Sequence, residues 1–294
     1  MSVDGRPERV VRPAPLGLRF RDVATGLPVR DGLRVAVTSL RNPLRAMTLE
    51  VNGSGVWYAH RFPGLNDETL ATTADWTALR QPCRIAVEDP AGRFHPAIFD
   101  LDLPVRGLAD WPGWNALPQA PLAPLIDDPA AGAVCPQQFP LFSTPARSAP
   151  APLAELRAQV ARVDTGEPVA WAIVTASDAG KTCGIGVADD KGRVVLFFAF
   201  PDRPRAALAT SPPAVTDFSW SLDIRAYWSG LPADAVPPFA DLMAQLNDPR
   251  DLLNSTASPA EALPAQLLSL GRPLTLRTSA TPTGPTSFLM TAAA

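Results

Sequence analysis

Apolar and polar residues alternate along two stretches of the chain that lie 140 positions apart. A period of two is typical of a half-buried β-strand. Each stretch is followed by a Thr-Gly-x-Pro-Val segment, which favours a tight turn because Gly accepts a positive φ and Pro fixes the backbone after it. The pattern therefore predicts the same strand-and-turn unit twice. Its apolar positions are Leu16, Leu18 and Phe20 before the turn at 25–29, and Leu156, Ala158 and Val160 before the turn at 165–169.

Further strands are predicted after each turn. Second strands are predicted at 33–38 and 171–175, and third strands, which end in Phe-Pro, within 53–63 and 189–201. Closing strands are predicted at 84–88, 99–103 and 218–228. The sequence thus predicts an all-β protein with two tandem β-sandwich modules, residues 16–106 and 152–230, after an N-terminal arm at 1–15.

Residues 107–151 form a Pro-rich strap between the predicted modules. Pro recurs there too often for a continuous helix or a central strand. Because the strap also carries large apolar side chains, it is expected to lie on a surface. Two interpretations remain open: the strap packs across its own modules, or a partner protein orders it. Its candidate interface residues are Trp111, Trp114, Phe139 and Phe142.

Residues 231–294 are predicted to form a small tail of short helices and a terminal β-hairpin. Pro238 opens a short helix in which apolar residues recur at helical spacing. A second brief helix is predicted after Ser258, because a Glu follows three residues later as in a capping box. The segments 272–279 and 286–291 predict the hairpin, which either completes its own sheet or joins the edge of a neighbouring subunit. Candidate interface residues in this hairpin are Leu274, Leu276, Phe288 and Met290.

Composition and charge limit the functions that such modules can have. The 294-residue chain contains 34 prolines, which disfavour long helices, and its net charge of −3 provides no basic field for nucleic acid. No stretch of about 18 apolar residues occurs, so neither a secretion signal nor membrane insertion is expected. We therefore expect a location in the bacterial cytoplasm. The cysteines at 83, 135 and 183 lack the spacing of a zinc site and are expected to be reduced.

Gly180, Lys181 and Thr182 have the sequence that ends a phosphate-binding loop. However, Thr175 stands where that loop requires Gly or Ala, and two glycines and a turn follow in place of a helix. We therefore expect no nucleotide site at this position.

The remaining candidates for catalysis or metal binding are His60, His95, Asp100 and Asp102. Neither histidine has a second histidine at the spacing of a metal motif, and two carboxylates alone specify no metal. We expect histidines with structural hydrogen bonds, solvated carboxylates, and no cofactor. An enzyme would require these four residues to converge.

The strand, the Thr-Gly-x-Pro-Val turn and the strand that ends in Phe-Pro resemble the transthyretin-like, or carboxypeptidase-regulatory-like, β-sandwich module. In that family a D-x-x-T-G-x-P-V turn joins the first two strands. The second copy in this chain departs from the family pattern, because Arg162 occupies the position of Asp22. The resemblance implies a binding or scaffold unit and brings no catalytic residues. The matching turn residues are Asp22, Thr25, Gly26 and Pro28 in the first copy and Thr165, Gly166 and Pro168 in the second.

The whole layout is also similar to tandem-module proteins encoded beside phage-tail-like contractile injection systems. This resemblance implies a non-enzymatic structural component that docks to sheath, tube, cap or baseplate proteins and is oligomeric in a particle released by lysis. The alternative is a carbohydrate- or cell-surface-binding module, which predicts exposed Trp and Tyr on one face. Exposure of Trp57, Trp111, Trp114 and Trp228 separates the two expectations.

Overall fold

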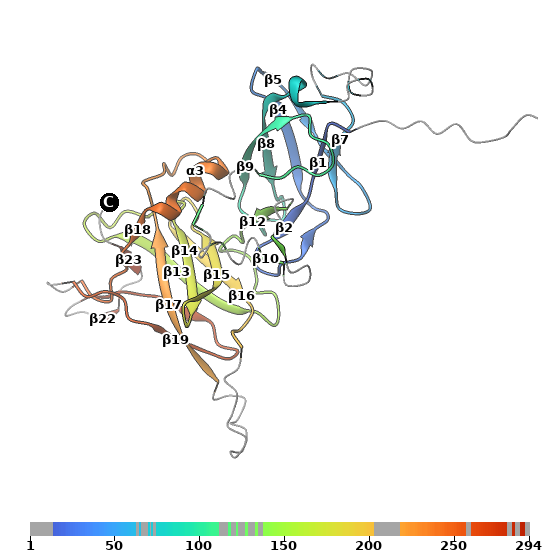
Figure 1. Ribbon diagram of the computed structural model, residues 1–294. Helices are drawn as coiled ribbons and strands as arrows, with labels where there is room; N and C mark the ends of the chain where they lie inside the picture. The colour runs from blue at the N-terminus through green and yellow to red at the C-terminus, as the bar shows by residue number, and fades with distance from the viewer. Residues whose placement is uncertain are drawn as a thin grey trace, which may run out of the picture.

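The computed structural model describes residues 14–62, 65, 70, 72, 75–111, 117–118, 122, 127–128, 133–134, 138–202, 218–256, 260–280, 284–285 and 289–291. The described chain is all-β and sandwich-like, with α3 (Phe239–Ala244) as its described α-helix and short 3₁₀ turns η1 (Thr77–Leu79) and η4 (Gln245–Asn247). Figure 1 shows two groups of strands, an N-terminal half in blue and cyan and a C-terminal half in yellow to red. None of the described helices has the length and apolar character needed to cross a bilayer.

The described strands of the N-terminal half form three small sheets around one core. The largest has the order β5 (Asn42–Thr48), β4 (Arg34–Ser39), β8 (Gln81–Glu88) and β9 (Ala97–Leu103). Facing strands form the orders β1 (Leu16–Leu18), β7 (Trp57–Ala59), β6 (Glu50–Val51) and β12 (Phe139–Leu141), β2 (Phe20–Asp22), β3 (Pro28–Val29). Residues alternate between buried and partly exposed along β4 and β8, as the period of two predicts.

The described strands of the C-terminal half form two larger sheets and a short hairpin. One sheet has the order β15 (Lys181–Val187), β14 (Ile173–Asp178), β17 (Ser219–Tyr227), with β18 (Pro249–Arg250) and β19 (Gln266–Ser269) on β17. The other joins β16 (Arg193–Phe198) to β13 (Ala154–Arg162), whose far edge pairs with β20 (Leu274–Thr275) and β23 (Leu289–Thr291). Two short hairpins complete the described pairings, β10 (Asp127–Asp128) with β11 (Ala133–Val134) and β21 (Ser279–Ala280) with β22 (Gly284–Pro285).

The strap supplies a strand to the N-terminal half. β12 pairs in parallel with β2, and Phe139 and Phe142 lie in the same core as Phe20 and Phe99. Trp111 is buried against Phe239. This burial corrects the prediction that these three side chains form an interface with a partner, because the chain's own core covers them. The module therefore does not end at 106, and Trp114 lies outside the described residues.

The tail confirms one prediction, overturns a second and shortens a third. α3 buries Phe239, Leu242 and Met243 as predicted. The helix predicted after Ser258 is wrong, because Ala262 bridges to Leu253 and β19 follows on the edge of β17. Pairing across the sheet there outweighs the local capping signal.

The predicted hairpin of 272–279 with 286–291 is, among the described residues, limited to the pairing of β21 with β22. Both segments pair in parallel with β13, at Leu156–Arg157 and at Val160–Arg162, so they complete the chain's own sheet. Leu276 is fully buried and Leu274 half-buried, which removes them as exposed docking residues. Met290 pairs through its backbone with Ala161, and Phe288 lies outside the described residues.

One hydrophobic cluster crosses from one half to the other. It contains the N-terminal core together with Trp171, Ile173 and Val187 of the C-terminal half and the buried side chains of α3. A second cluster lies between the sheets of the C-terminal half. Because apolar burial is the main stabilising contribution, the shared cluster holds the two halves together.

Candidate functional site

The turn after β2 is organised by the carboxylate of Asp22. It accepts hydrogen bonds from the backbone N–H of Ala24 at 2.9 Å and from Thr25 Oγ1 at 2.8 Å. Gly26 follows at φ +70°, a conformation that favours glycine, and Pro28 begins β3. The D-x-x-T-G-x-P spacing therefore describes a turn in which one side chain satisfies the backbone.

Arg147 of the strap binds the same carboxylate. Its Nη1 and Nη2 donate to the two oxygens of Asp22 at 2.9 and 2.7 Å, and Nη1 also donates to Ser143 Oγ at 2.8 Å. The guanidinium lies over the ring of Phe94, 4.9 Å from its centroid. A bidentate ion pair of this kind fixes the relative orientation of the two side chains as well as balancing their charge. Arg147 therefore holds the strap against the first turn.

The second turn, residues 162–167, has different chemistry at the same positions. Arg162 replaces the aspartate and pairs with Asp164 at 2.6 Å, which lowers the pKa of Asp164. Thr165 and Gly166 keep their places, with Gly166 at φ +70°, and Pro168 bridges to Ala161. This turn carries an ion pair on the surface where the first turn carries one that is mostly buried.

The first turn docks on the C-terminal sandwich. Ala24 packs against Val195 and Phe197 on the outer face of β16, together with Leu153. We call this cluster the inter-half contact. Arg157 lies beside it on β13, where it pairs with Glu155 and donates to the carbonyl oxygens of Pro145 and Arg147. The outer face of β13 and β16 is thus covered by the turn and strap of the N-terminal half.

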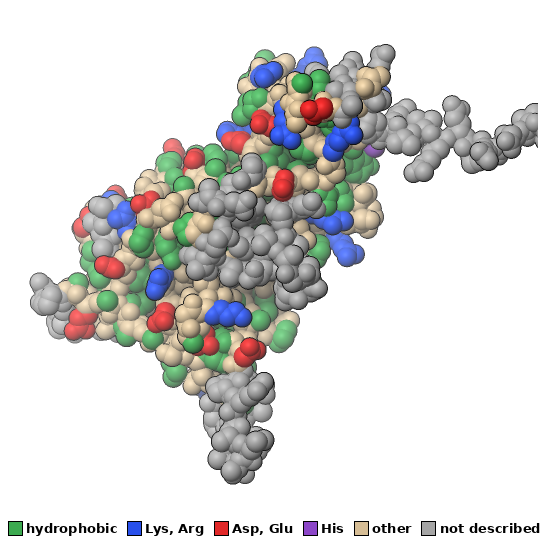
Figure 2. All heavy atoms as spheres, viewed as in Figure 1, with side chains coloured by type: hydrophobic (Ala, Val, Ile, Leu, Met, Phe, Trp, Pro, Cys, Tyr) green, Lys and Arg blue, Asp and Glu red, His purple; other side chains and the backbone are tan. Residues whose placement is uncertain are grey.

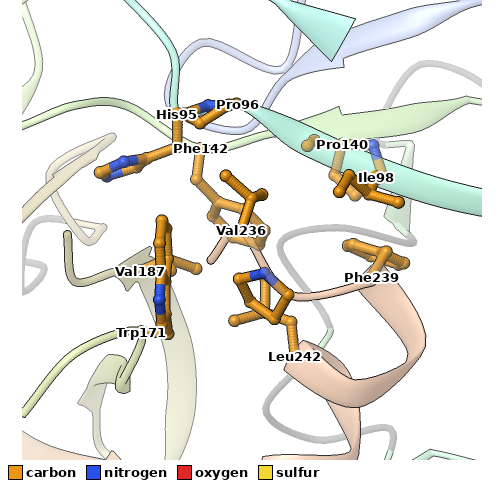
Figure 3. Close-up of a pocket in the computed structure, with 12 residues that line it drawn as sticks. His95, Pro96, Ile98, Pro140, Phe142, Trp171, Val187, Val236, Phe239 and Leu242 are labelled. Atoms are coloured by element: carbon orange, nitrogen blue, oxygen red, sulfur yellow. The ribbon is translucent and has the colours of Figure 1, made fainter. Parts of the chain in front are cut away.

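A second contact between the halves surrounds a small cleft of about 20 Å³, which has room for roughly one water. Figure 3 shows the rings of His95 and Trp171 on one side of this cleft and Phe239 and Leu242 of α3 on the other. The rings of His95 and Trp171 meet edge to face, with centroids 6.3 Å apart. Its walls are almost wholly apolar, so the cleft is a packing contact with little polar chemistry.

Gln245 organises the backbone around this cleft. Its side chain is fully buried, donates to the carbonyl oxygens of Trp171 at 2.8 Å and Leu242 at 3.3 Å, and accepts from the N–H of Ser229. Trp171 has φ +61°, which is rare for a large side chain. The hydrogen bonds of Gln245 hold Trp171 in this strained conformation.

The candidate catalytic residues do not come together. His95 lines the cleft, where burial lowers its pKa and its Nε2 has no hydrogen-bond partner among the described residues. His60 is exposed beside Tyr58, with ring centroids 4.8 Å apart. Asp100 forms an exposed ion pair with Arg84 across β8 and β9. In the part of the chain that the structure describes, no three His, Cys, Asp or Glu side chains could hold a metal ion.

The segment that resembles a phosphate loop is a β-hairpin. Gly180 adopts φ +81° in the turn, and Lys181 and Thr182 begin β15 in place of a helix. Cys183 on this strand and Cys83 on β8 are free thiols, and burial raises their pKa values to about 11 and about 12. Such thiols are protonated and unreactive at neutral pH. Cys135 lies outside the described residues.

The described tryptophans pack in the interior. Trp57, Trp111 and Trp228 are all buried, as are Trp171 and Trp220. The burial of Trp57, Trp111 and Trp228 means that these three are not the exposed tryptophans that a carbohydrate-binding face predicts.

Two surface grooves had no clear sequence signal. One, of about 750 Å³, is lined by Phe200, Trp220, Glu155, Asp202 and Arg272, among others, with the two aromatic centroids 5.3 Å apart. The other, of about 650 Å³, runs along β1 and β7. We call it the distal groove. Its lining residues come from 14–19, 52–60 and 107–108, segments that only the fold brings together.

Two further turns share one design. Asp89 and Asp189 each accept backbone N–H bonds from the following turn and pair with Arg93 and Arg193, four residues later. The sequences Asp-Pro-Ala-Gly-Arg and Asp-Asp-Lys-Gly-Arg share the spacing Asp-x-x-Gly-Arg, and this shared spacing was the sequence signal for the common turn. These acidic groups are structural, since their oxygens are taken by backbone and guanidinium.

Comparisons with known proteins give no family. No protein family and no curated protein matches the sequence. Among solved structures, the shaft pilin SpaA from Lactobacillus rhamnosus GG is similar at 10% identity over 95% of this chain and 97% of that chain, with a TM-score of 0.22. A C-terminal fragment of the pilus adhesin SpaC from Lactobacillus rhamnosus GG is similar at 10% identity over 95% and 96%, with a TM-score of 0.19. Such low TM-scores carry no argument, and the class defined by the structure remains an all-β, sandwich-like protein.

Proposed function

We propose that the chain is a non-enzymatic structural component of a phage-tail-like contractile particle and acts by docking to other protein subunits. The inter-half contact carries this proposal. In it, a turn held by Asp22 and Arg147 docks on the outer face of a neighbouring sheet through Ala24, Val195 and Phe197. Such turn-on-sheet docking needs no ligand and can recur between subunits.

The proposal includes two tandem transthyretin-like sandwiches. Equivalent pairings in the two halves support it: β4 pairs with β5 and β8 as β14 pairs with β15 and β17. β1 pairs with β7 as β13 pairs with β16, and the neighbouring β2 gains a parallel strand from later in the chain, as β13 does. The choice of a contractile particle, assembled in the bacterial cytoplasm from sheath, tube, cap or baseplate subunits, rests on the resemblance of the layout.

The test is capture of the tagged protein from a lysate of its own organism, followed by mass spectrometry and negative-stain imaging. Recovery of sheath, tube or baseplate proteins on rod-shaped particles is the expected result. A tagged, unrelated β-sandwich of similar size is the control. Recovery of the protein without any such companion would overturn the proposal.

One observation favours a second function, a carbohydrate- or surface-binding module. The groove around Phe200 and Trp220 combines two neighbouring aromatic rings, tilted by 35° to each other, with Glu155, Asp202 and Arg272, a combination suited to sugars. Titration with glycans monitored by Trp fluorescence tests it, with Phe200→Ala as the binding-deficient variant. Absence of any saturable change in the wild-type protein would exclude this second function.

A further inference from the structure

The outer faces of the two sandwiches have equivalent strand registers. They differ in how far other parts of the chain cover them. Gly17 pairs with Tyr58 in the N-terminal half, and Arg157 pairs with Val195 in the C-terminal half, at the same 140-residue offset as the two turns. Two residues further along the chain lie His60, just after the end of β7, and Phe197 on β16. Tyr58 and His60 are therefore the counterparts of the inter-half contact residues Val195 and Phe197.

The exposure of these counterparts differs. Val195 and Phe197 are buried, because the first turn of the chain lies on them. Tyr58 is half-buried and His60 exposed, and both line the distal groove. The groove thus occupies the place on the N-terminal half where, on the C-terminal half, a turn is docked.

The second turn corresponds to the docked first turn, but its side chains are exposed. Val163 stands at the position of Val23, which packs on the N-terminal core, yet it is 40% exposed. Asp164 and Glu167 take the positions of Ala24 and Leu27, with 40% and 69% of their side chains exposed. This turn therefore presents an apolar residue flanked by two carboxylates that share one cation, Arg162, which leaves the turn with a net negative charge.

The chemistry of the two surfaces is complementary. Arg19 and His60 border the distal groove, while Leu16 and Gly17 provide an apolar floor. An acidic turn with one exposed valine fits such a groove by charge and by shape. Figure 1 places β23, which pairs with the strand residues just before the second turn, and β7 toward opposite ends of the molecule, so one copy cannot join its own two surfaces.

We propose that the second turn of one copy docks into the distal groove of a second copy, so that copies add head to tail. The contact repeats between chains the arrangement that the first turn makes with β16 within the chain. Because its two sides are different surfaces, it is heterologous and can extend beyond a dimer. This inference rests on the proposed function, since it names a second copy as one docking partner.

Two variants test the contact by complementation. Glu167→Arg alters the turn and leaves the groove intact, whereas His60→Asp alters the groove and leaves the turn intact. Each alone is expected to weaken self-association of the full-length protein at least about tenfold in sedimentation velocity. A mixture of the two must restore association, because the intact turn of the His60→Asp variant meets the intact groove of the Glu167→Arg variant.

Two controls make the outcome decisive. Leu44→Ser, which changes an almost fully exposed residue on the edge strand β5, should leave association unchanged. Removal of residues 1–13 should also leave it unchanged or strengthen it. A wild-type protein that stays monomeric, an effect of Leu44→Ser equal to that of Glu167→Arg, or loss of association without residues 1–13 would each overturn the inference. If the monomeric protein still captures particle subunits, the proposed function survives that result.

Discussion

Arg147 binds Asp22 across 125 positions of sequence, with one guanidinium nitrogen on each carboxylate oxygen at 2.9 and 2.7 Å. The ion pair closes the strap over the first turn, directly beside the contact of Ala24 with Val195 and Phe197. Position 22 therefore links three elements: the turn itself, the strap and the neighbouring sandwich. In the second copy, Arg162 takes this position and pairs with its own turn.

The first prediction concerns the stability of this contact. Arg147→Met leaves the mostly buried Asp22 carboxylate without its counter-charge, so we expect the free energy of unfolding to fall by about 2 to 4 kcal/mol. Arg84→Met breaks the exposed pair with Asp100 and should cost less than about 1 kcal/mol. Urea unfolding followed by Trp fluorescence compares them. Equal losses would show that the Arg147 pair is not special.

The second prediction uses two glycines in equivalent turns. Gly92 and Gly192 have φ +68° and +71°, so Ala at either position incurs about 1 to 2 kcal/mol of backbone strain. A Cβ at Gly92 meets open space, whereas one at Gly192 would clash with the carbonyl oxygen of Val160. We expect Gly192→Ala to destabilise the protein by at least about 1 kcal/mol more than Gly92→Ala. Thermal unfolding of both variants measures the difference, and similar melting temperatures would contradict it.

The alternating pattern predicts most of the fold because burial on one face of a strand leaves a period of two. Strands at 16–20, 34–38 and 154–160 are where this period is clearest, and the structure has strands there. β12 gave no such signal, since its three residues contain Pro140 and all are buried. Its pairing with β2 depends on a contact more than a hundred residues away in sequence, which no local pattern encodes.

The sites were less predictable than the strands. Asp22 and Gly26 carry a local turn signal, but Arg147 lies in a Pro-rich segment whose composition suggested only surface contact. His95 and Trp171 are likewise far apart in sequence and meet because the two halves share a core. Sequence identifies residues that satisfy their own turn, while contacts between distant segments require the fold.

The third prediction concerns the thiols. Burial raises the pKa of Cys83 to about 12 and that of Cys183 to about 11, so at pH 8 far fewer than about one thiol in a hundred is ionised. In a Cys135→Ser variant, Ellman's reagent should therefore react slowly with the native protein and rapidly with two thiols in urea. Fast reaction of the native variant would contradict the burial of both residues.

The last prediction is a pH dependence from His95. Burial lowers the pKa of its imidazole in the folded state, against smaller opposing effects from Asp189, Asp190 and the backbone of Val187, while nearby Arg193 also lowers it. In the unfolded chain this histidine has a pKa near 6.5, so below that pH the unfolded state binds a proton that the folded state does not bind. This contribution to stability is complete above about pH 6.5 and is lost as the pH falls from there toward the folded pKa.

Replacement of His95 by an uncharged residue removes this contribution, so the wild-type protein should lose more stability between pH 7.5 and pH 5 than His95→Gln does. Urea midpoints of both proteins at the two pH values measure this, and other titrating groups cancel in the comparison. A wild-type loss no larger than that of the variant would mean that water reaches His95 and that the cleft between the halves opens.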